Sequence, residues 1–202
     1  ISVKKSGVKN ANLLVRIPGW ARNQVVPSDL YKYSDAEKPA YTVTVNGKAV
    51  EADLDANKGY LPVKNIKKGD VIRIHFDMPI RTVVANNKVA DDKGKVAVER
   101  GPLVYCAEAV DNNNEPVLRA VMAKKPTFTL VDNYSIQNTE TKGAPAFSVK
   151  AIKTDAQVLE EGANGISVKN DKLTLIPYYA WNHRGANEMN VWFIQSLSML
   201  DK

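Results

Sequence analysis

The chain has 202 residues, of which 44% are hydrophobic and 25% are charged, and its net charge is +6. These values are typical of a soluble globular protein with one large or two small cores, since domains usually have about 100–150 residues. No run of about 18 apolar residues occurs, which excludes a membrane-spanning helix, and the lysines are scattered at turns, which argues against a nucleic-acid partner.

Alternation of apolar and polar residues predicts a series of short strands in the first half of the chain. The first, at residues 12–17, stops at Pro18-Gly19, because proline lacks an amide hydrogen and glycine permits a turn. The second, at 41–45, runs into Asn46-Gly47, the strongest short hairpin signal. Further strands are expected at residues 48–52, 59–63, 70–76, 79–85 and 95–100. In the strand at 70–76, Ile72, Ile74 and Phe76 should point inward and His75 outward.

The run at residues 111–116 has no apolar residue and is rich in turn formers, so it predicts a linker between domains at 1–110 and 111–202. Strands are expected beyond it at residues 128–131, 147–152, 166–168, 173–176 and 189–194. No segment longer than about ten residues has the apolar period of a helix. The expected fold is all-β, with two consecutive antiparallel β-sandwich domains of jelly-roll or immunoglobulin-like type.

Residues able to carry out catalysis or hold a metal are scarce. Cys106 is the single cysteine, which excludes an internal disulfide and a multi-cysteine zinc site, and its apolar surroundings at 103–107 predict a buried strand. A nucleophilic cysteine needs a neighbouring base or cation, and two histidines are too few for a convincing site. The adjacent carboxylates at 91–92 and 160–161 are interpreted as loop charges. The sequence therefore predicts no catalytic residue and no metal ligand.

Aromatic residues beside polar groups are the candidates for sugar binding, because a ring can stack on the apolar face of a sugar. In a strand, Tyr179, Trp181 and His183 would share one face, opposite Tyr178. Packing against a neighbouring domain is the interpretation that we favour for these rings. The candidate substrate-binding residues are Trp20, Tyr179, Trp181, His183 and Arg184.

Three short motifs, in this order along the chain, are its most distinctive sequence features. They are Arg-Ile-Pro-Gly-Trp at 16–20, Arg-Gly-Pro-Leu-Val-Tyr-Cys at 100–106, and Ile-Pro-Tyr-Tyr-Ala-Trp-Asn-His-Arg-Gly at 176–185. Together with shorter matches at 45–47, 59–61, 68–70 and 77–81, they resemble the C-terminal region of the bacterial β-L-arabinofuranosidase-like enzymes of glycoside hydrolase family 127. The resemblance runs from about Leu13 to Trp192.

In such enzymes an upstream (α/α)6 barrel does the chemistry and supplies a nucleophilic cysteine and a glutamate/cysteine zinc site. Cys106 does not align with the family's catalytic cysteines, and the chain begins at Ile1 without an initiator methionine, as a fragment would. The resemblance therefore implies a non-catalytic accessory region without a cofactor of its own, which supports the barrel as its partner. The zinc that it implies belongs to the barrel.

Several alternatives stay open at this point. A carbohydrate-binding module that recognises arabinose-containing plant polysaccharide is the second candidate function, and a homodimer of the parent is left open. A periplasmic or extracellular location is favoured over a cytoplasmic one. In many relatives the Ile-Pro-Gly-Trp motif is followed after a short connection by Val-Asn-Gly. In this chain residues 21–40 are inserted between the two motifs. This insertion is expected on the surface, as tolerated length or as a loop that reaches toward the barrel.

Overall fold

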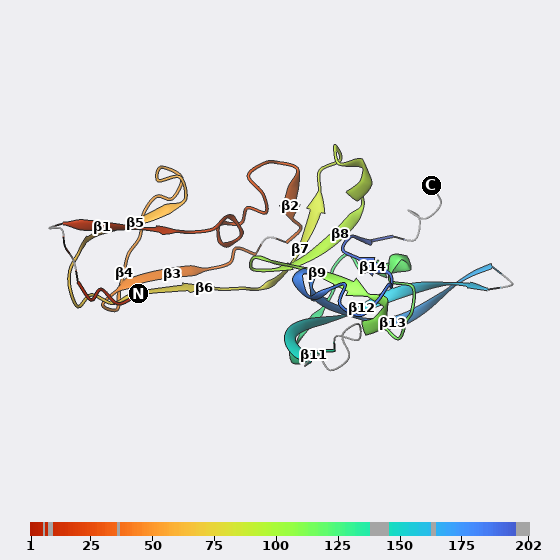
Figure 1. Cartoon of the computed structure of the whole chain (residues 1–202). Helices are drawn as coiled ribbons and strands as arrows, with labels where there is room; N and C mark the ends of the chain where they lie inside the picture. The colour runs from red at the N-terminus through yellow and green to blue at the C-terminus, as the bar shows by residue number, and fades with distance from the viewer. Residues whose placement is uncertain (6, 8–9, 36, 138–145, 163–164, 197–202) are drawn as a thin grey trace. The chain divides into compact units, whose positions relative to one another are not determined.

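The computed structural model describes residues 1–5, 7, 10–35, 37–137, 146–162 and 165–196, and it confirms the expected all-β fold. Strands and short 3-10 helices make up the regular structure of these residues (Figure 1). In this part of the chain no helix has the length and apolar character needed to cross a membrane. The chain forms two compact units, one of Ile1–Ser28 and Asp35–Pro79 and the other of Asp29–Ser34 and Ile80–Lys202.

The first unit has two facing sheets. One pairs β1 (Ala11–Arg16) with β5 (Tyr60–Ile66), and the other has the order β4 (Lys48–Ala49), β3 (Tyr41–Val45) and β6 (Ile72–Phe76). Both sheets contribute to one core of buried residues: Val15, Ile17, Ala21, Val43, Leu61, Val63 and Ile72. Ile74 and Phe76 pack against this core and His75 is exposed, so the predicted inward face of β6 is confirmed.

Two turns in the first unit depend on backbone that only certain residues adopt. Asn46 and Gly47 have φ values of 50° and 82°, as the predicted two-residue hairpin between β3 and β4 requires. After β1, Pro18 precedes the 3-10 helix η1 (Gly19–Arg22), which ends at Asn23 with φ 63°. The strand end and corner that the sequence predicts here are therefore present.

Gly59 lies in a crowded place beside this corner. Its φ is +81°, and a Cβ atom there would collide with Arg16 Nη1 and lie 3.1 Å from Arg22 Nη2. Arg16 Nη1 donates a hydrogen bond of 2.6 Å to the Lys58 carbonyl, and its guanidinium lies 5.2 Å from the centre of the Tyr60 ring. A side chain at position 59 would therefore strain the backbone and displace Arg16.

We expect Gly59→Ala to lower the free energy of unfolding of the first unit by about 2–3 kcal/mol, from left-handed strain and the lost Arg16 hydrogen bond. Gly47→Ala is the matched control, because its φ is +82° and nothing lies within 4 Å of the added Cβ. The control should cost about 1–2 kcal/mol, from strain alone. Urea unfolding of both variants measures the difference. Equal losses would show that Arg16 moves aside without cost.

The second unit is built on a single ten-stranded sheet. Its pairings close into a ring of six strands: β8 (Lys95–Arg100), β9 (Leu103–Glu108), β13 (Gly165–Pro177), β12 (Phe147–Gly162), β10 (Ala120–Met122) and β15 (Phe193–Ile194), which pairs with β8 again. The 3-10 helices between strands are η2 (Ala90–Asp92), η3 (Ala109–Asp111), η4 (Val117–Arg119) and η5 (Tyr178–Ala180). The other strands of the sheet are β2 (Tyr31–Tyr33), β7 (Ile80–Ala85), β11 (Phe128–Ile136) and β14 (Met189–Asn190).

Part of the 21–40 insertion belongs to the second unit. Strand β2 pairs antiparallel with β7 at the edge of the sheet. The Tyr33 hydroxyl donates a hydrogen bond of 3.1 Å to Glu99, and the Arg81 guanidinium lies 3.5 Å from the centre of the Tyr33 ring. The Tyr31 hydroxyl donates to Asp92 over 3.0 Å. The middle of the insertion is therefore an edge strand fixed by its tyrosines.

The two units divide at Pro79, whereas the turn-rich run at 111–116 predicted a boundary near residues 109–117. The run lies within the second unit, because β8 and β9 on its N-terminal side pair with β15 and β13 on its C-terminal side. Asn112 is buried, and its side chain donates to the carbonyls of Glu108 and Thr174 over 2.7 and 3.1 Å and accepts from Thr174 N over 2.7 Å. Turn-forming residues here connect strands of one unit.

Candidate functional site

The aromatic and basic residues near the end of the chain form a loop between β13 and β14. Pro177 ends β13 and is followed by the 3-10 turn η5, so the strand alternation expected for residues 178–183 is wrong. Tyr178 and Tyr179 are both exposed, at 45% and 62%, instead of pointing to opposite faces of a sheet. The structure therefore presents two neighbouring tyrosines on the surface of the second unit.

Trp181 and His183 lie beside these tyrosines but differ in their surroundings. Trp181 is half-buried, packs against the core around Cys106, and its ring centre lies 5.7 Å from that of Tyr178. His183 is exposed, and its ring meets the edge of Phe147 at 6.2 Å between centres. The loop thus has an exposed aromatic rim and one ring that anchors it to the core.

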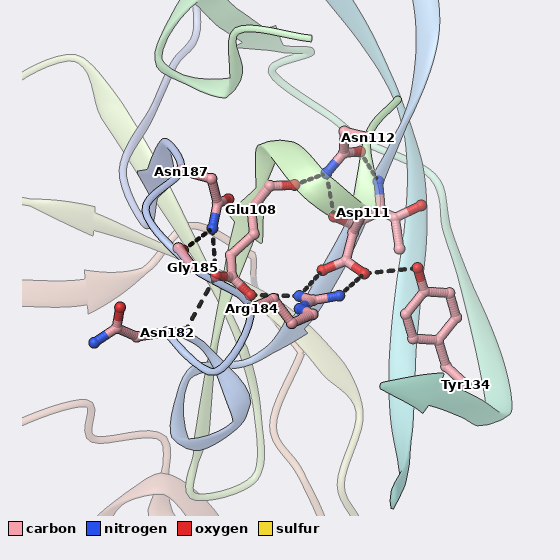
Figure 2. Close-up of polar contacts among 9 residues, drawn as sticks. Glu108, Asp111, Asn112, Tyr134, Asn182, Arg184, Gly185 and Asn187 are labelled. Atoms are coloured by element: carbon pink, nitrogen blue, oxygen red, sulfur yellow. Dashed lines mark hydrogen bonds and ion pairs between the residues drawn. The ribbon is translucent and has the colours of Figure 1, made fainter. Parts of the chain in front are cut away.

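Arg184 is buried below the rim, between two carboxylates (Figure 2). Its guanidinium pairs with Glu108 and with both carboxylate oxygens of Asp111, and the distance from Nη1 to Asp111 Oδ1 is 2.6 Å. The exposed fractions of the three side chains are 6%, 0% and 2%. Two carboxylates thus face one cation inside the protein, and the remaining acceptor capacity of the carboxylates must be met by other donors.

Neutral donors supply those contacts. The Tyr134 hydroxyl donates to Asp111 over 2.8 Å, and Asn182 N and Asn187 Nδ2 donate to Glu108 over 3.1 and 3.2 Å (Figure 2). Since Asn182 and Asn187 lie on either side of Arg184 in the chain, Glu108 holds both ends of the turn. We call Glu108, Asp111, Tyr134, Asn182, Arg184 and Asn187 the arginine network.

The network keeps Arg184 charged in spite of its burial. Burial alone lowers the pKa of Arg184, but hydrogen bonds and attraction from Asp111 and Glu108 outweigh it, so the pKa rises above its ordinary value. The pKa of Tyr134 is also raised, first by burial and then by its hydrogen bond to Asp111. Both groups therefore keep their protons throughout the physiological range.

The structure places four of the five sequence-predicted site residues in one loop of the second unit and Trp20 in the first unit. Tyr179, Trp181, His183 and Arg184 share the loop, but Arg184 faces inward and is bound by carboxylates. Trp20 is half-buried in the first unit, where it meets the edge of Phe76 at 5.4 Å and packs against the core. Sugar contact by the exposed rings stays a prediction. The partners of Arg184 were missed, because Glu108 ends an apolar strand and Asp111 begins the run interpreted as a linker.

Cys106 is fully buried in β9, as its apolar neighbours predicted. Burial, then the nearby charges of Glu108 and Asp111, raise the pKa of its thiol to about 12, so it is protonated at neutral pH and a poor nucleophile. Among the described residues, no three His, Cys, Asp or Glu side chains are grouped so that they could hold a metal ion. The zinc that the resemblance implies does not fit any donor set in this part of the chain.

Comparisons with known proteins agree with the resemblance. Residues 1–78 match the model of the "Beta-L-arabinofuranosidase, GH127 middle domain", and residues 80–194 match that of the "Glycoside hydrolase family 127 C-terminal domain". The chain is 33% identical over 184 residues to the non-reducing end beta-L-arabinofuranosidase of Bifidobacterium longum subsp. longum. The alignment covers 88% of this chain and 25% of the Bifidobacterium protein.

Solved structures give the same result. A GH127 beta-arabinofuranosidase superposes with a TM-score of 0.82 at 45% identity over 96% of this chain and 29% of its own. A GH127 beta-L-arabinofuranosidase from Geobacillus stearothermophilus T6 gives a TM-score of 0.69 at 27% identity. That match covers 93% of this chain and 27% of the Geobacillus chain. This chain therefore spans less than a third of each of these relatives. The chain belongs to glycoside hydrolase family 127, and it corresponds to the middle and C-terminal domains of that family.

Proposed function

We propose that this region is a non-catalytic accessory part of a family 127 glycosidase and that it supports a catalytic barrel elsewhere in the parent protein. The observation that carries the proposal is the match of its two parts to the family's middle and C-terminal domains, at 25–29% of the length of the named relatives. The buried, protonated Cys106 supports it, because a nucleophile of this type would have to be exposed and ionised.

The parent's reaction follows from the relatives' names. They are called beta-L-arabinofuranosidases, and we propose that the parent hydrolyses β-L-arabinofuranosides in its barrel. The zinc site implied by the resemblance would lie there as well. This region would contribute no reacting group, and its part would be to hold the barrel in a stable shape.

The exposed tyrosines are the surface through which we propose that the region supports the barrel. Tyr178 and Tyr179 stand on a short turn whose following residues are fixed by the arginine network. Exposed aromatic side chains on a rigid support are typical of protein interaction sites, because little conformational freedom is lost on binding. The buried charges would serve this surface by keeping the turn in one conformation.

Tyr179→Ser tests this role in the intact parent enzyme. In the isolated region it should leave the melting temperature nearly unchanged, since the side chain is 62% exposed. In the parent it should lower the melting temperature and the activity on aryl β-L-arabinofuranosides, because the contact with the barrel is lost. Leu118→Ser is the matched control, an apolar side chain that is 58% exposed in the same unit, and should change neither quantity in either protein.

Two results would contradict the proposal. Turnover of aryl arabinofuranosides by the isolated region, abolished by Cys106→Ala, would make it catalytic. Retention on plant arabinan in affinity electrophoresis, lost in a stable Tyr179→Ser variant, would instead favour the carbohydrate-binding alternative. The specific observation that keeps this second candidate is the exposure of Tyr178, Tyr179 and His183 in one loop, since exposed rings beside polar groups suit sugar stacking.

A further inference from the structure

A hollow of about 660 Å³ lies on the second unit, and neither the aromatic loop nor the arginine network contributes to its lining. Its size is within the range of about 300–1,000 Å³ that is usual for small-molecule sites. Three neighbouring strands, β10, β12 and β13, and the residues after β15 form it. Its lining includes Val121, Ala123, Asp155, Gln157, Asn170 and Lys172.

Strand register explains why these polar side chains meet. Val121 pairs with Gln157, and Gln157 pairs with Asn170, so these three residues form one row across the sheet. Asp155 pairs with Lys172 in the adjacent row of the same face. Side chains of directly paired residues point to the same side of a sheet. The hollow therefore has two parallel rows of polar side chains that end at β10.

The polar side chains of the two rows contact one another across the strands. Gln157 Nε2 donates to Asn170 Oδ1 over 3.4 Å, and the Lys172 ammonium forms an ion pair with Asp155. Both pairs are exposed at the rim and have unused hydrogen-bonding capacity, since an amide has two donor hydrogens and two acceptor lone pairs. Val121 and Ala123 lie on the same face as Gln157 and give the hollow its apolar part, whereas Met122 and Ala156 point to the opposite face, into the core.

Charge decides which ligand fits. The ammonium of Lys172 is compensated by Asp155, and Asp171 is paired with Lys169 at 3.5 Å, so the hollow has no uncompensated cation for a phosphate or carboxylate. The amides and the ion pair offer both donors and acceptors in rows, as vicinal hydroxyl groups require, and the side chains of Val121 and Ala123 can meet C–H groups. We infer that this hollow is a binding site for a short, neutral oligosaccharide.

This inference goes beyond the proposed support of the barrel, and it concerns residues other than the aromatic loop. It predicts contact with carbohydrate without ring stacking, so we expect weak affinity. Calorimetric titration of the region with arabinotriose, xylotriose and cellotriose tests it. We expect saturable binding of at least one of the three, with a Kd that does not depend on salt, because no net charge is neutralised.

The variant Gln157→Ala/Asn170→Ala should weaken this binding about tenfold, since it removes two hydrogen-bonding side chains. Ala123→Trp, at an exposed position in the lining, should abolish binding by filling the hollow while leaving the fold intact. The matched control is Asp132→Ala/Lys150→Ala, which removes an exposed ion pair of 3.1 Å between β11 and β12 outside the hollow. The control should bind as the unchanged region does.

Three outcomes would overturn the inference: no binding of any trisaccharide, binding that survives both hollow variants, or binding of an anionic sugar in place of a neutral one. Protection of β10 and β13 from hydrogen exchange in the intact parent, with loss of saccharide binding there, would also overturn it, because a protein surface would then cover the hollow. The measurement is binding to the isolated region, so failure here leaves the barrel-support proposal to its own test of activity in the parent.

Discussion

Replacing Arg184 with methionine is expected to lower the free energy of unfolding of the second unit by about 3–5 kcal/mol. The variant leaves Glu108 and Asp111 without their cation, and the side chains of these carboxylates are 0% and 2% exposed. A buried carboxylate without a partner must be desolvated at large cost or take up a proton. Urea unfolding followed by tryptophan fluorescence measures the loss, since Trp181 and Trp192 lie in this unit.

Two further variants identify the cause of the loss. Lys150→Met removes the cation of an exposed pair with Asp132 and should cost about 1 kcal/mol or less, because water screens such pairs. Adding Glu108→Gln to Arg184→Met should restore part of the stability, since one of the two uncompensated charges is then removed. If the double variant is less stable than Arg184→Met, the cost comes from lost packing and hydrogen bonds rather than from unpaired charge.

The strands of the first unit could be predicted closely, because local signals specify them. The Asn46-Gly47 hairpin, the corner after β1 and the inward face of β6 each depend on a few neighbouring residues. The buried position of Cys106 could be predicted for the same reason, since its apolar neighbours lie in one strand.

Features that depend on distant pairing were missed. The run at 111–116 has the composition of a linker, but Asn112 is buried. It is hydrogen-bonded to the backbone of Thr174, which is 62 residues away in the chain. Strand β2 has only three residues, too few for a recognisable alternation, and it is fixed by β7 and the Glu99 carboxylate. Arg184 was found by composition, but nothing in the local sequence indicates that its partners are 73 and 76 residues away.

The ring of strands in the second unit is closed by its shortest member, and this makes Phe193 a sensitive position. Strand β15 pairs antiparallel with β8 at Val96 and parallel with β10 at Val121. Phe193 is fully buried in the core that both of these strands share. Phe193→Ala is therefore expected to lower the free energy of unfolding by about 3–5 kcal/mol, from lost apolar burial and the cavity left behind.

Phe147→Ala is the matched control, because the same residue type is 37% exposed at the start of β12, where it contacts His183. It should cost about 1 kcal/mol or less. Phe193→Leu should recover most of the loss, since it restores apolar volume to the same site. Urea unfolding of the three variants gives the comparison, and equal losses for Phe193→Ala and Phe147→Ala would mean that β15 is not needed to close the ring. If Phe193→Ala also lowers the slope of unfolding against urea, the core has opened around β15 in the native state, because less surface is then left to expose.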